Sequence, residues 1–456
     1  MFGYVDVHTH LELPEFDNDC EEVINRAKVE GLEFICTVGI EPKYWKRAIN
    51  IAEQHDFIYA SIGVHPHEAL IYNDKIEKEL RATLSHPKCL MLGEIGLDFF
   101  KNYSPREKQV AVFERQLDIA EGLKKPVMIH IRDAHKEAKE ILKKKALRGI
   151  IHCFSGTIQD AKEYISMGYY ISIPGTVTFK KATNIHDVVK TIPLDFILSE
   201  TDAPFITPEP FRGKRNEPAF VKYTVKRIAE LKNLPEEDVK RTIYTNAFKA
   251  FNLGIETDVK IFYKIRNSLY INITNRCTNR CVFCGKQRDF FVKGHYLKLP
   301  KEPTLYEIMQ ALPSKISSYD EIVFCGYGEP TLRLQLIKEL AKQLKSKGAK
   351  KIRLNTDGLA NLREGRDVVL EIKGLIDAVS ISLNAADKET YEKLCQPTIS
   401  GAFESLVSFI KSAKENIKEV TATAVAVPDL DISKIKTFAE QILQVNFRER
   451  PYDDLG

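Results

Sequence analysis

Three cysteines stand close together in the second half of the sequence. The segment CTNRCVFC places Cys277, Cys281 and Cys284 with three and then two residues between them. Three thiolates suit a [4Fe–4S] cluster and would leave one of its irons open. A structural zinc site takes four ligands, usually as two separated pairs. Because His295 could supply a fourth ligand, zinc remains the alternative interpretation of this segment.

Histidines and carboxylates form a second group with chemical potential. They stand at the ends of apolar, β-branched runs in the first half of the sequence, and they are His8, His10, Glu94, His130, His152 and Asp202. Imidazole and carboxylate ligands favour divalent ions, and a carboxylate can bridge two of them. Such a site activates water near neutral pH and polarises a phosphoryl or carbonyl oxygen. A single strand-end histidine is more often a core residue, but six such residues at strand ends favour a metal site.

The elements that must position this second group are strands that alternate with helices. The strand-like runs are YVDVHTH, FICTVG, IYASIGVHP, CLMLGEIGLD, PVMIHIRD, GIIHCFSG, YYISIPG and ILSETDA. Eight strand–helix units predict an α/β fold, an N-terminal (β/α)8 TIM barrel, whose chemistry lies at the carboxyl ends of its strands. Residues i and i+2 of a strand share a face, so His8 and His10 can both point into the barrel mouth, as can Glu200 and Asp202.

The second half of the sequence predicts a smaller barrel around the cysteines. Its strand-like runs are SLYINITNRC, EIVFCGYGEP, KIRLNTDG, AVSISLNA, EVTATAVAV and QVNFRER, with helical patterns between them. Six units predict a C-terminal partial (β/α)6 barrel. We therefore expect one domain over residues 1–254, a linker over 255–267 and a second domain over 268–456. Each kind of site then has a barrel mouth of its own.

Composition sets limits on the class of protein. The 456 residues are 44% hydrophobic and 29% charged, which is typical of a soluble globular chain of more than one domain. The net charge of +4 neither supports nor excludes a nucleic-acid partner. An odd count of nine cysteines argues against a disulfide framework. We see no apolar run that could span a membrane and no secretion signal at the start, which favours a cytoplasmic location.

The first half resembles a known family. The motifs DVHTHL, GVHPH, GEIGLDFF, PVMIHIRDA, HCFSG and SETDAP, in that order over residues 1–254, are similar to those of the TatD family of metal-dependent hydrolases. The resemblance implies that the six strand-end residues hold one or two divalent ions (Zn, Mn, Mg or Ni). It also implies that Glu94 bridges the ions and that Glu94 and Asp202 are catalytic. The implied activity is that of a nuclease, 3′→5′ exonuclease action on DNA.

Five further residues of this half are expected to contact substrate. His65 and His67 lie in GVHPH, and they could bind substrate or support the metal ligands. Arg132, Lys214 and Arg215 are candidate phosphate binders, and a solvated surface charge is an equally good interpretation of these three.

The second half, from about residue 265 to 456, resembles the radical S-adenosylmethionine (radical SAM) enzymes. CTNRCVFC matches their cysteine motif, which implies a [4Fe–4S] cluster whose open iron holds S-adenosylmethionine and starts radical chemistry. Residues expected to contact this cofactor are Phe283, Gly326, Gly328, Glu329, Asn355, Asp357, Ser382 and Asn384. Glu329 would brace the methionine ammonium, and Ser382 and its neighbours would contact ribose and carboxylate. Ordinary polar residues on a strand face are the alternative.

Together the two resemblances predict a bifunctional enzyme, a TatD-like hydrolase fused to the radical SAM protein associated with it. We expect a phosphodiester substrate for the first half, and a nucleotide or nucleic-acid-related substrate for the second. An external electron donor of flavodoxin or ferredoxin type would reduce the cluster. One alternative has the second half modify a protein, as a glycyl-radical activase or peptide modifier, while the first hydrolyses an ester or amide. In another, the cluster is only a redox-sensing module.

Overall fold

The protein was analysed as a computed structural model, which describes residues 2–254, 260–287 and 290–452. The chain forms two compact units, residues 1–256 and 257–456. The predicted linker 255–267 lies partly outside the described residues, and its described part contains a strand that belongs to the second unit. Within the described residues, no helix combines the length and the apolar character that a membrane crossing requires.

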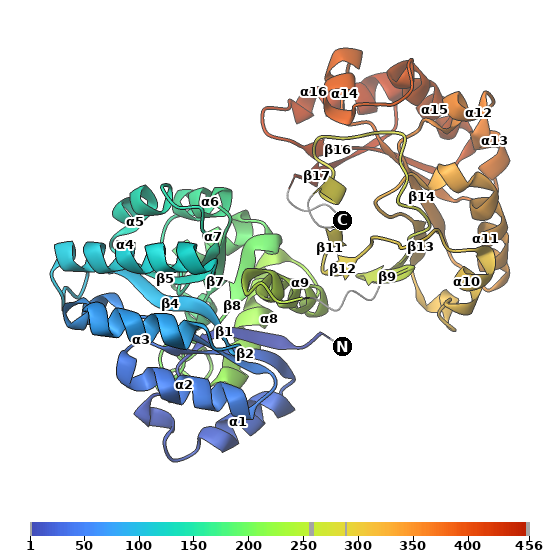
Figure 1. The fold of residues 1–456 in the computed structure, drawn as a ribbon. Helices are drawn as coiled ribbons and strands as arrows, with labels where there is room; N and C mark the ends of the chain where they lie inside the picture. The colour runs from blue at the N-terminus through green and yellow to red at the C-terminus, as the bar shows by residue number, and fades with distance from the viewer. Residues whose placement is uncertain (1, 255–259, 288–289, 453–456) are drawn as a thin grey trace. The chain divides into compact units, whose positions relative to one another are not determined.

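The first unit is built on an eight-stranded parallel sheet in sequential order, which curls into a barrel (Figure 1). Its strands are β1 (Tyr4–Thr9), β2 (Leu32–Gly39), β3 (Ile58–Ile62), β4 (Cys89–Asp98), β5 (Val127–Arg132), β6 (Gly149–Ile151), β7 (Tyr169–Ile173) and β8 (Ile197–Ser199). Each strand coincides with one of the predicted runs, and the predicted TIM barrel is thereby confirmed. The runs form strands because their β-branched and aromatic side chains pack well on a pleated surface.

Helices surround this barrel on its outer side (Figure 1). They are α1 (Cys20–Val29), α2 (Pro42–Gln54), α3 (Asp74–Leu84), α4 (Arg106–Leu123), α5 (His135–Leu142), α6 (Ile158–Ser166), α7 (Thr183–Thr191), α8 (Val221–Lys232) and α9 (Glu236–Ala250). Local signals set several of their ends. For example, the Thr157 and Asp160 side chains form a reciprocal capping box at the start of α6.

The barrel closes where β8 meets β1. The Ser199 hydroxyl donates to the Val5 carbonyl oxygen over 2.8 Å. The buried Asp6 carboxyl group accepts hydrogen bonds from the Thr201 N–H (2.9 Å) and hydroxyl (2.5 Å). Beyond the strand ends, the Asp202 N–H donates to the His8 carbonyl oxygen over 2.9 Å. This seam therefore holds the ends of β1 and β8, with His8 and Asp202, in a fixed relation.

The second unit contains a seven-stranded sheet in the order β17-β16-β15-β14-β13-β10-β9. Its strands are β9 (Phe262–Ile265), β10 (Ser268–Ile271), β13 (Glu321–Phe324), β14 (Ile352–Thr356), β15 (Ala378–Ser382), β16 (Glu419–Ala426) and β17 (Asn446–Pro451). The six strands from β10 to β17 are parallel neighbours, as predicted for a partial barrel. The additional strand β9 pairs antiparallel with β10 at the edge of the sheet.

The remaining elements of the second unit are a hairpin and its helices. The hairpin joins β11 (Phe291–Val292) to β12 (His295–Tyr296). The helices are α10 (Leu305–Gln310), α11 (Leu334–Ser346), α12 (Ala360–Glu364), α13 (Val368–Ile372), α14 (Lys388–Cys395), α15 (Ala402–Asn416), α16 (Ile432–Thr437) and the π-helical turn Phe438–Leu443. From α11 onward these helices cover the outer face of the sheet (Figure 1).

Side-chain alternation gives the second sheet two different faces. On β14, Ile352 and Leu354 are buried in the hydrophobic core beneath the helices. Successive side chains of a strand point to opposite sides, so Arg353 and Asn355 lie on the other, inner face. The same alternation on β15 puts Ser380 and Ser382 on the inner face. The polar side chains of the sheet thus face away from the helices.

Candidate active sites

Glu94, the sixth of the ten residues of β4, is the centre of the first site. Its Oε1 atom lies 2.8 Å from His130 Nδ1, 3.0 Å from His152 Nε2 and 3.4 Å from His65 Nε2. Its Oε2 atom lies 3.4 Å from His8 Nε2. The carboxylate is almost completely buried. One carboxylate between four imidazoles is the arrangement expected of a ligand shared by two cations.

A second cluster of donor atoms lies at the seam. His8 Nε2 is 3.2 Å from His10 Nε2 and 3.7 Å from Asp202 Oδ1, and His10 Nε2 is 3.3 Å from Asp202 Oδ1. The His8 ring also stacks on the His152 ring with centroids 3.7 Å apart. All six residues predicted from strand ends therefore meet at one rim of the barrel. Their converging lone pairs fit one or two divalent cations.

Buried carboxylates behind the imidazoles set the direction of their lone pairs. His10 Nδ1 lies 2.9 Å from the Val38 carbonyl oxygen and 3.2 Å from Glu12, so its Nε2 atom is left facing the site. On the opposite side, Asp98 Oδ2 lies 3.3 Å from His130 Nε2 and 2.8 Å from His67 Nε2. Partners of this kind fix the tautomer and orientation of metal-binding imidazoles.

Burial and neighbouring charges shift the protonation of the site. Burial alone would raise the pKa of Glu94, but the imidazoles of His152 and His65 and the hydrogen bond from His130 hold it well below its usual range. Burial lowers the pKa of His65 to about 4 and also lowers that of His8. Burial has the same effect on His10, His130 and His152, but neighbouring carboxylates outweigh it and raise the pKa of these three imidazoles. An imidazole offers a lone pair to a cation only when it is neutral, so binding of a cation at this site would compete with protons.

A glycine lets the two central strands come together. Gly96 in β4 has a φ of +143°, and a Cβ atom built on it would lie 1.9 Å from the carbonyl oxygen of His130 in β5. A side chain at this position would therefore push β5 away. Gly96 thus keeps Glu94 and His130 within contact distance.

The five predicted substrate-binding residues of the first unit have different surroundings. His65 touches Glu94, and His67 is half-buried against Asp98. Arg132 is exposed and stacks over the Phe100 ring at 3.9 Å. Lys214 is exposed, with its ammonium group 5.7 Å from the centroid of the Phe211 ring. The Arg215 guanidinium instead forms a two-bonded ion pair with Asp19, at 2.6 and 2.8 Å. Phosphate binding by Arg132, Lys214 and Arg215 stays a prediction.

The three cysteines lie on the loop that follows β10, and all are partly exposed. Backbone hydrogen bonds tie this loop to the end of α14. The Arg280 and Val282 N–H groups donate to the Cys395 and Leu394 carbonyl oxygens over 3.0 and 2.9 Å, and the Thr398 N–H donates to the Thr278 carbonyl oxygen over 2.9 Å. The loop conformation is therefore set by the protein fold.

A fourth thiol lies beside this loop. Cys395 is completely buried at the last position of α14, and its thiol lies close enough to that of Cys281 to raise the pKa of the Cys281 thiol. The Asn384 amide also donates to the Cys395 sulfur over 3.6 Å. In the sequence Cys395 is isolated from the other cysteines, and only the fold brings it to them.

Two buried carboxylates stand next to the thiols. The negative charges of Asp357 and Glu329 act on Cys277 and, together with burial, raise the pKa of its thiol. The hydroxyl of Thr278 donates to Asp357, and the Asp357 N–H donates to Glu329 over 2.7 Å. Within the described parts of the chain, neither carboxylate forms an ion pair with a lysine or arginine. Burial and the charge of Glu329 raise the pKa of Asp357 well above its usual range, so the pair carries less negative charge than two ionised carboxylates would. The charge that remains fits a cationic ligand such as an ammonium or sulfonium group.

Three of the other residues predicted to contact the cofactor, Gly326, Gly328 and Asn384, lie against protein atoms in the structure. A Cβ atom on Gly328 would lie 2.3 Å from the Thr274 carbonyl oxygen, and one on Gly326 would lie 2.1 Å from the Asn272 side chain. The two glycines therefore allow close approach of protein atoms. Asn384 accepts from the Val425 N–H over 3.2 Å.

Of the remaining three, Asn355 and Ser382 lie on the inner face of the sheet and Phe283 packs against the core. Asn355 accepts a hydrogen bond from Arg353 over 3.3 Å. Their contacts with a cofactor stay predictions.

Three carboxylates of the first site were not predicted as site residues. Asp98 stands four residues after Glu94 on the same strand, so the period of two that pairs His8 with His10 could have found it. Glu12 follows His10 by two residues but lies beyond the strand. Glu200 was placed at the barrel mouth, and its Oε1 atom lies 3.4 Å from His152 Nδ1 and accepts from the Cys153 N–H over 2.6 Å.

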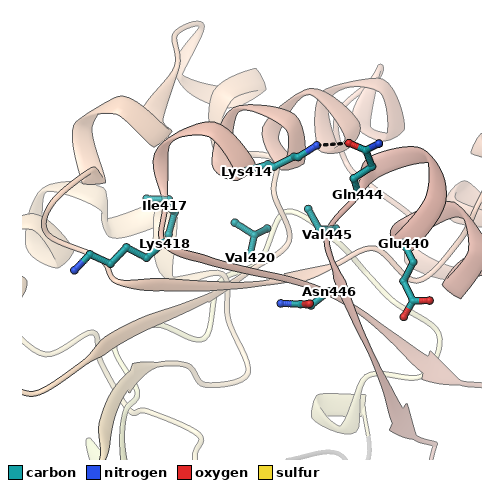
Figure 2. A pocket seen from close by; sticks show the side chains of 8 residues that line it. All are labelled: Lys414, Ile417, Lys418, Val420, Glu440, Gln444, Val445 and Asn446. Atoms are coloured by element: carbon teal, nitrogen blue, oxygen red, sulfur yellow. Dashed lines mark hydrogen bonds between the residues drawn. The ribbon is translucent and has the colours of Figure 1, made fainter.

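A cavity of about 480 Å³ lies elsewhere, between α15 and the start of β17 (Figure 2). Lys414 donates to Gln444 across it over 2.7 Å, and Glu440 also lines it. Neither the predicted metal ligands nor the three loop cysteines line this cavity.

The fold and the first site define a class of protein. A (β/α)8 barrel with imidazoles and carboxylates gathered at the carboxyl ends of its strands is the framework of a metal-dependent hydrolase. The second unit, a partial barrel with three thiols after its first parallel strand, has the framework of a radical enzyme.

Comparison with known proteins identifies the families. Residues 5–252 match the family of TatD-related DNases, and residues 271–442 match the radical SAM superfamily. The chain belongs to the TatD-related DNase family and carries a radical SAM domain after it. Both domains are of enzyme families, a metal-dependent hydrolase or nuclease and a radical SAM enzyme.

Three similar proteins illustrate the match of the first unit. An uncharacterized metal-dependent hydrolase, YabD of Bacillus subtilis strain 168, is 43% identical over 252 residues, which are 55% of this chain and 99% of the relative. The 3′-5′ ssDNA/RNA exonuclease TatD of Rahnella sp. strain Y9602 is 34% identical over 258 residues, 55% of this chain and 98% of the relative. The crystal structure of the TatD homologue YjjV from Escherichia coli K12 is 30% identical, with a TM-score of 0.53 over 55% of this chain and 98% of that chain.

Proposed function

We propose that the first domain is a 3′→5′ exonuclease that uses one or two divalent ions. In the proposal, one ion would be held by His8, His10, Asp202 and Glu94, and the other by Glu94, His130 and His152. The observation that carries the proposal is the single Glu94 carboxylate between four imidazoles. The relative from Rahnella, named an exonuclease for single-stranded DNA and RNA, supports a nucleic-acid substrate.

The chain's own groups have distinct parts in this hydrolysis. When bound, divalent ions would activate water and polarise the phosphoryl oxygen. The Glu94 and Asp202 carboxylates would set the positions of the ions. Asp98 would orient the His130 imidazole toward the site, and Glu12 would orient that of His10. In the proposal, the neutral His65 beside Glu94 would donate a hydrogen bond to a phosphate oxygen of the substrate.

We propose that the second domain holds a [4Fe–4S] cluster on Cys277, Cys281 and Cys284 and binds S-adenosylmethionine beside it. The cluster would supply the electron that cleaves the cofactor and starts radical chemistry. Glu329 and Asp357 give this position negative charge, which favours the cationic cofactor. The proposed substrate is a nucleotide or a nucleic-acid-related molecule, and the electron donor is a flavodoxin or ferredoxin.

The proposal is tested on anaerobically reconstituted protein. With dithionite and S-adenosylmethionine we expect release of 5′-deoxyadenosine, which rises when DNA, RNA or nucleotides are added. Cys281→Ala should lose the cluster absorbance and this product, whereas Cys89→Ala, a buried thiol of the first domain, should keep both. Cluster-loaded protein that never cleaves S-adenosylmethionine would favour the redox-sensing alternative.

The hydrolase half is tested separately with end-labelled oligonucleotides and Mn²⁺. Glu94→Gln should abolish shortening from the 3′ end while cluster loading is unchanged. Unchanged digestion by Glu94→Gln would contradict the metal assignment. Parent protein that hydrolyses simple esters or amides but no oligonucleotide would support the alternative substrate class.

A further inference from the structure

Two arginines of β17 lie on the inner face of the second sheet. Phe447 packs against the core beneath the helices, so its neighbour Arg448 and, by the same alternation, Arg450 face the other way. The Arg448 guanidinium donates to the inner-face Ser380 hydroxyl over 3.4 Å. Both arginines therefore lie on the face that carries the predicted cofactor contacts.

Their charges lack a carboxylate partner in the described part of the chain. Arg353, on the same face, is paired with Glu321 through contacts of 2.7 and 3.1 Å. Arg448 and Arg450 form no ion pair with any described residue. The charge of Glu321 acts on Arg448 as well, but its ion pair is with Arg353, so the three guanidinium charges of the inner face exceed the single carboxylate charge.

The guanidinium groups also disfavour one another. The Arg448 side chain as a whole is exposed, but partial desolvation of its guanidinium group and the charges of Arg353 and Arg450 lower its pKa. Like charges held close together on a sheet are stabilised by an anion between them. Because two like charges held close together do not stabilise the fold, this pair of arginines favours a role in binding a ligand.

The register places these arginines beside the predicted cofactor position. Thr423 of β16 pairs with Ser382 on one side and with Arg448 on the other. Two residues further along β16, Val425 pairs with Arg450, and its N–H donates to the Asn384 side chain. The arginines therefore continue the same rows of inner-face residues across two strands.

We propose that Arg448 and Arg450 bind an oxyanion, a phosphate or a carboxylate, of the molecule on which the radical domain acts. The inference rests on the proposed function of this domain and specifies the class of its substrate. Guanidinium groups suit this role because their paired N–H donors match the oxygens of phosphate and carboxylate.

The test is arginine labelling with phenylglyoxal on the anaerobically reconstituted full chain, read by peptide mass spectrometry. The probes are thymidine 5′-monophosphate, thymidine 5′-carboxylic acid and thymidine. We expect one or both anions to slow labelling of Arg448 and Arg450 about tenfold, and thymidine to have no effect. The control is Arg366, an exposed arginine paired with Glu371, whose labelling should not respond.

Affinities of variants complete the test. Arg448→Gln and Arg450→Gln should each weaken binding of the protective anion about tenfold or more. Lys418→Gln, which removes a charge from the rim of the outer cavity, should not. Equal labelling with and without both anions would overturn the inference, and so would protection by S-adenosylmethionine alone. If the anions protect the arginines in protein that releases no 5′-deoxyadenosine, the anion site is supported and the proposed radical function is contradicted.

Discussion

The replacement Asp98→Asn probes how the first site orients its imidazoles. Asp98 Oδ1 accepts the N–H groups of Phe100 (3.0 Å) and Lys101 (2.8 Å), and asparagine can keep these bonds through its own oxygen. Oδ2, the atom that faces His67 and His130, becomes an amide nitrogen, which donates instead of accepting. The backbone turn should survive, and the imidazole orientation should not.

The size of the effect follows from this geometry. Loss of a partner behind a metal-binding imidazole typically lowers metal affinity or activity about 10–100-fold, or about 1.4–2.8 kcal/mol. Because one oxygen of Asp98 contacts two imidazoles, we expect a loss toward the upper end of that range. Stability should fall by less than about 2 kcal/mol, since the bonds to Oδ1 remain.

The assay is 3′-end shortening of an oligonucleotide over a Mn²⁺ titration, with thermal unfolding of the same preparations. Asp118→Asn is the matched control, because Asp118 lies on the surface of α4 in a pair with Lys145. Its rate should equal that of the parent. If Asp98→Asn hydrolyses at the parent rate at every Mn²⁺ concentration, the proposed role of Asp98 in orienting His130 is wrong.

Three further changes give distinct expectations. Gly96→Ala should destabilise the first domain by at least about 2 kcal/mol in calorimetry, because its Cβ would overlap a carbonyl oxygen of the next strand. The control is Gly122→Ala in α4, which has free space around the new methyl group and should instead stabilise the domain by about 0.5–1 kcal/mol. Cys395→Ser should keep about four irons per chain, since three cysteines suffice for the cluster; iron loss would identify a fourth ligand. Burial would raise the pKa of Asp160, but hydrogen bonds from Lys139 and Thr157 outweigh it and lower this pKa to about 2. Because the pKa in the unfolded chain is near 3.9, the ionised carboxylate stabilises the fold above about pH 4, and this stabilisation is lost toward pH 2. The difference in urea midpoint between parent and Asp160→Asn should shrink over that range.

The sequence was sufficient for the strands and for the groups that lie on them. Short apolar, β-branched runs followed by helical patterns located every strand of the first barrel. The shared carboxyl end of these strands then brought His8 and His152 together, although the chain between them is long. The sequence match to TatD-related DNases supports the same assignment. These predictions needed only local pattern and the rule that parallel strands share an end.

Contacts that depend on loops and on packing were harder to predict. The segment that forms β9 was predicted to be part of the linker 255–267. Its pairing with β10 depends on the tertiary fold. Cys395 gives no local signal, because its position beside Cys281 follows from backbone bonds between two distant segments. Likewise, a single sequence cannot tell that the Arg215 guanidinium is paired with Asp19, whereas Arg448 forms no ion pair with a carboxylate among the described residues.

The seam of the first barrel also bears on how that domain opens. Hydrogen bonds from Ser199, Thr201 and Asp202 to β1 connect the two sides of the seam. The strand β8 itself is only three residues long. His8 and His10 lie on one side of the seam and Asp202 lies on the other. An ion bound by all three would therefore cross-link the two sides. Stripping the ion with a chelator should thus quicken amide deuterium uptake first along this line, and restoring it should slow uptake there.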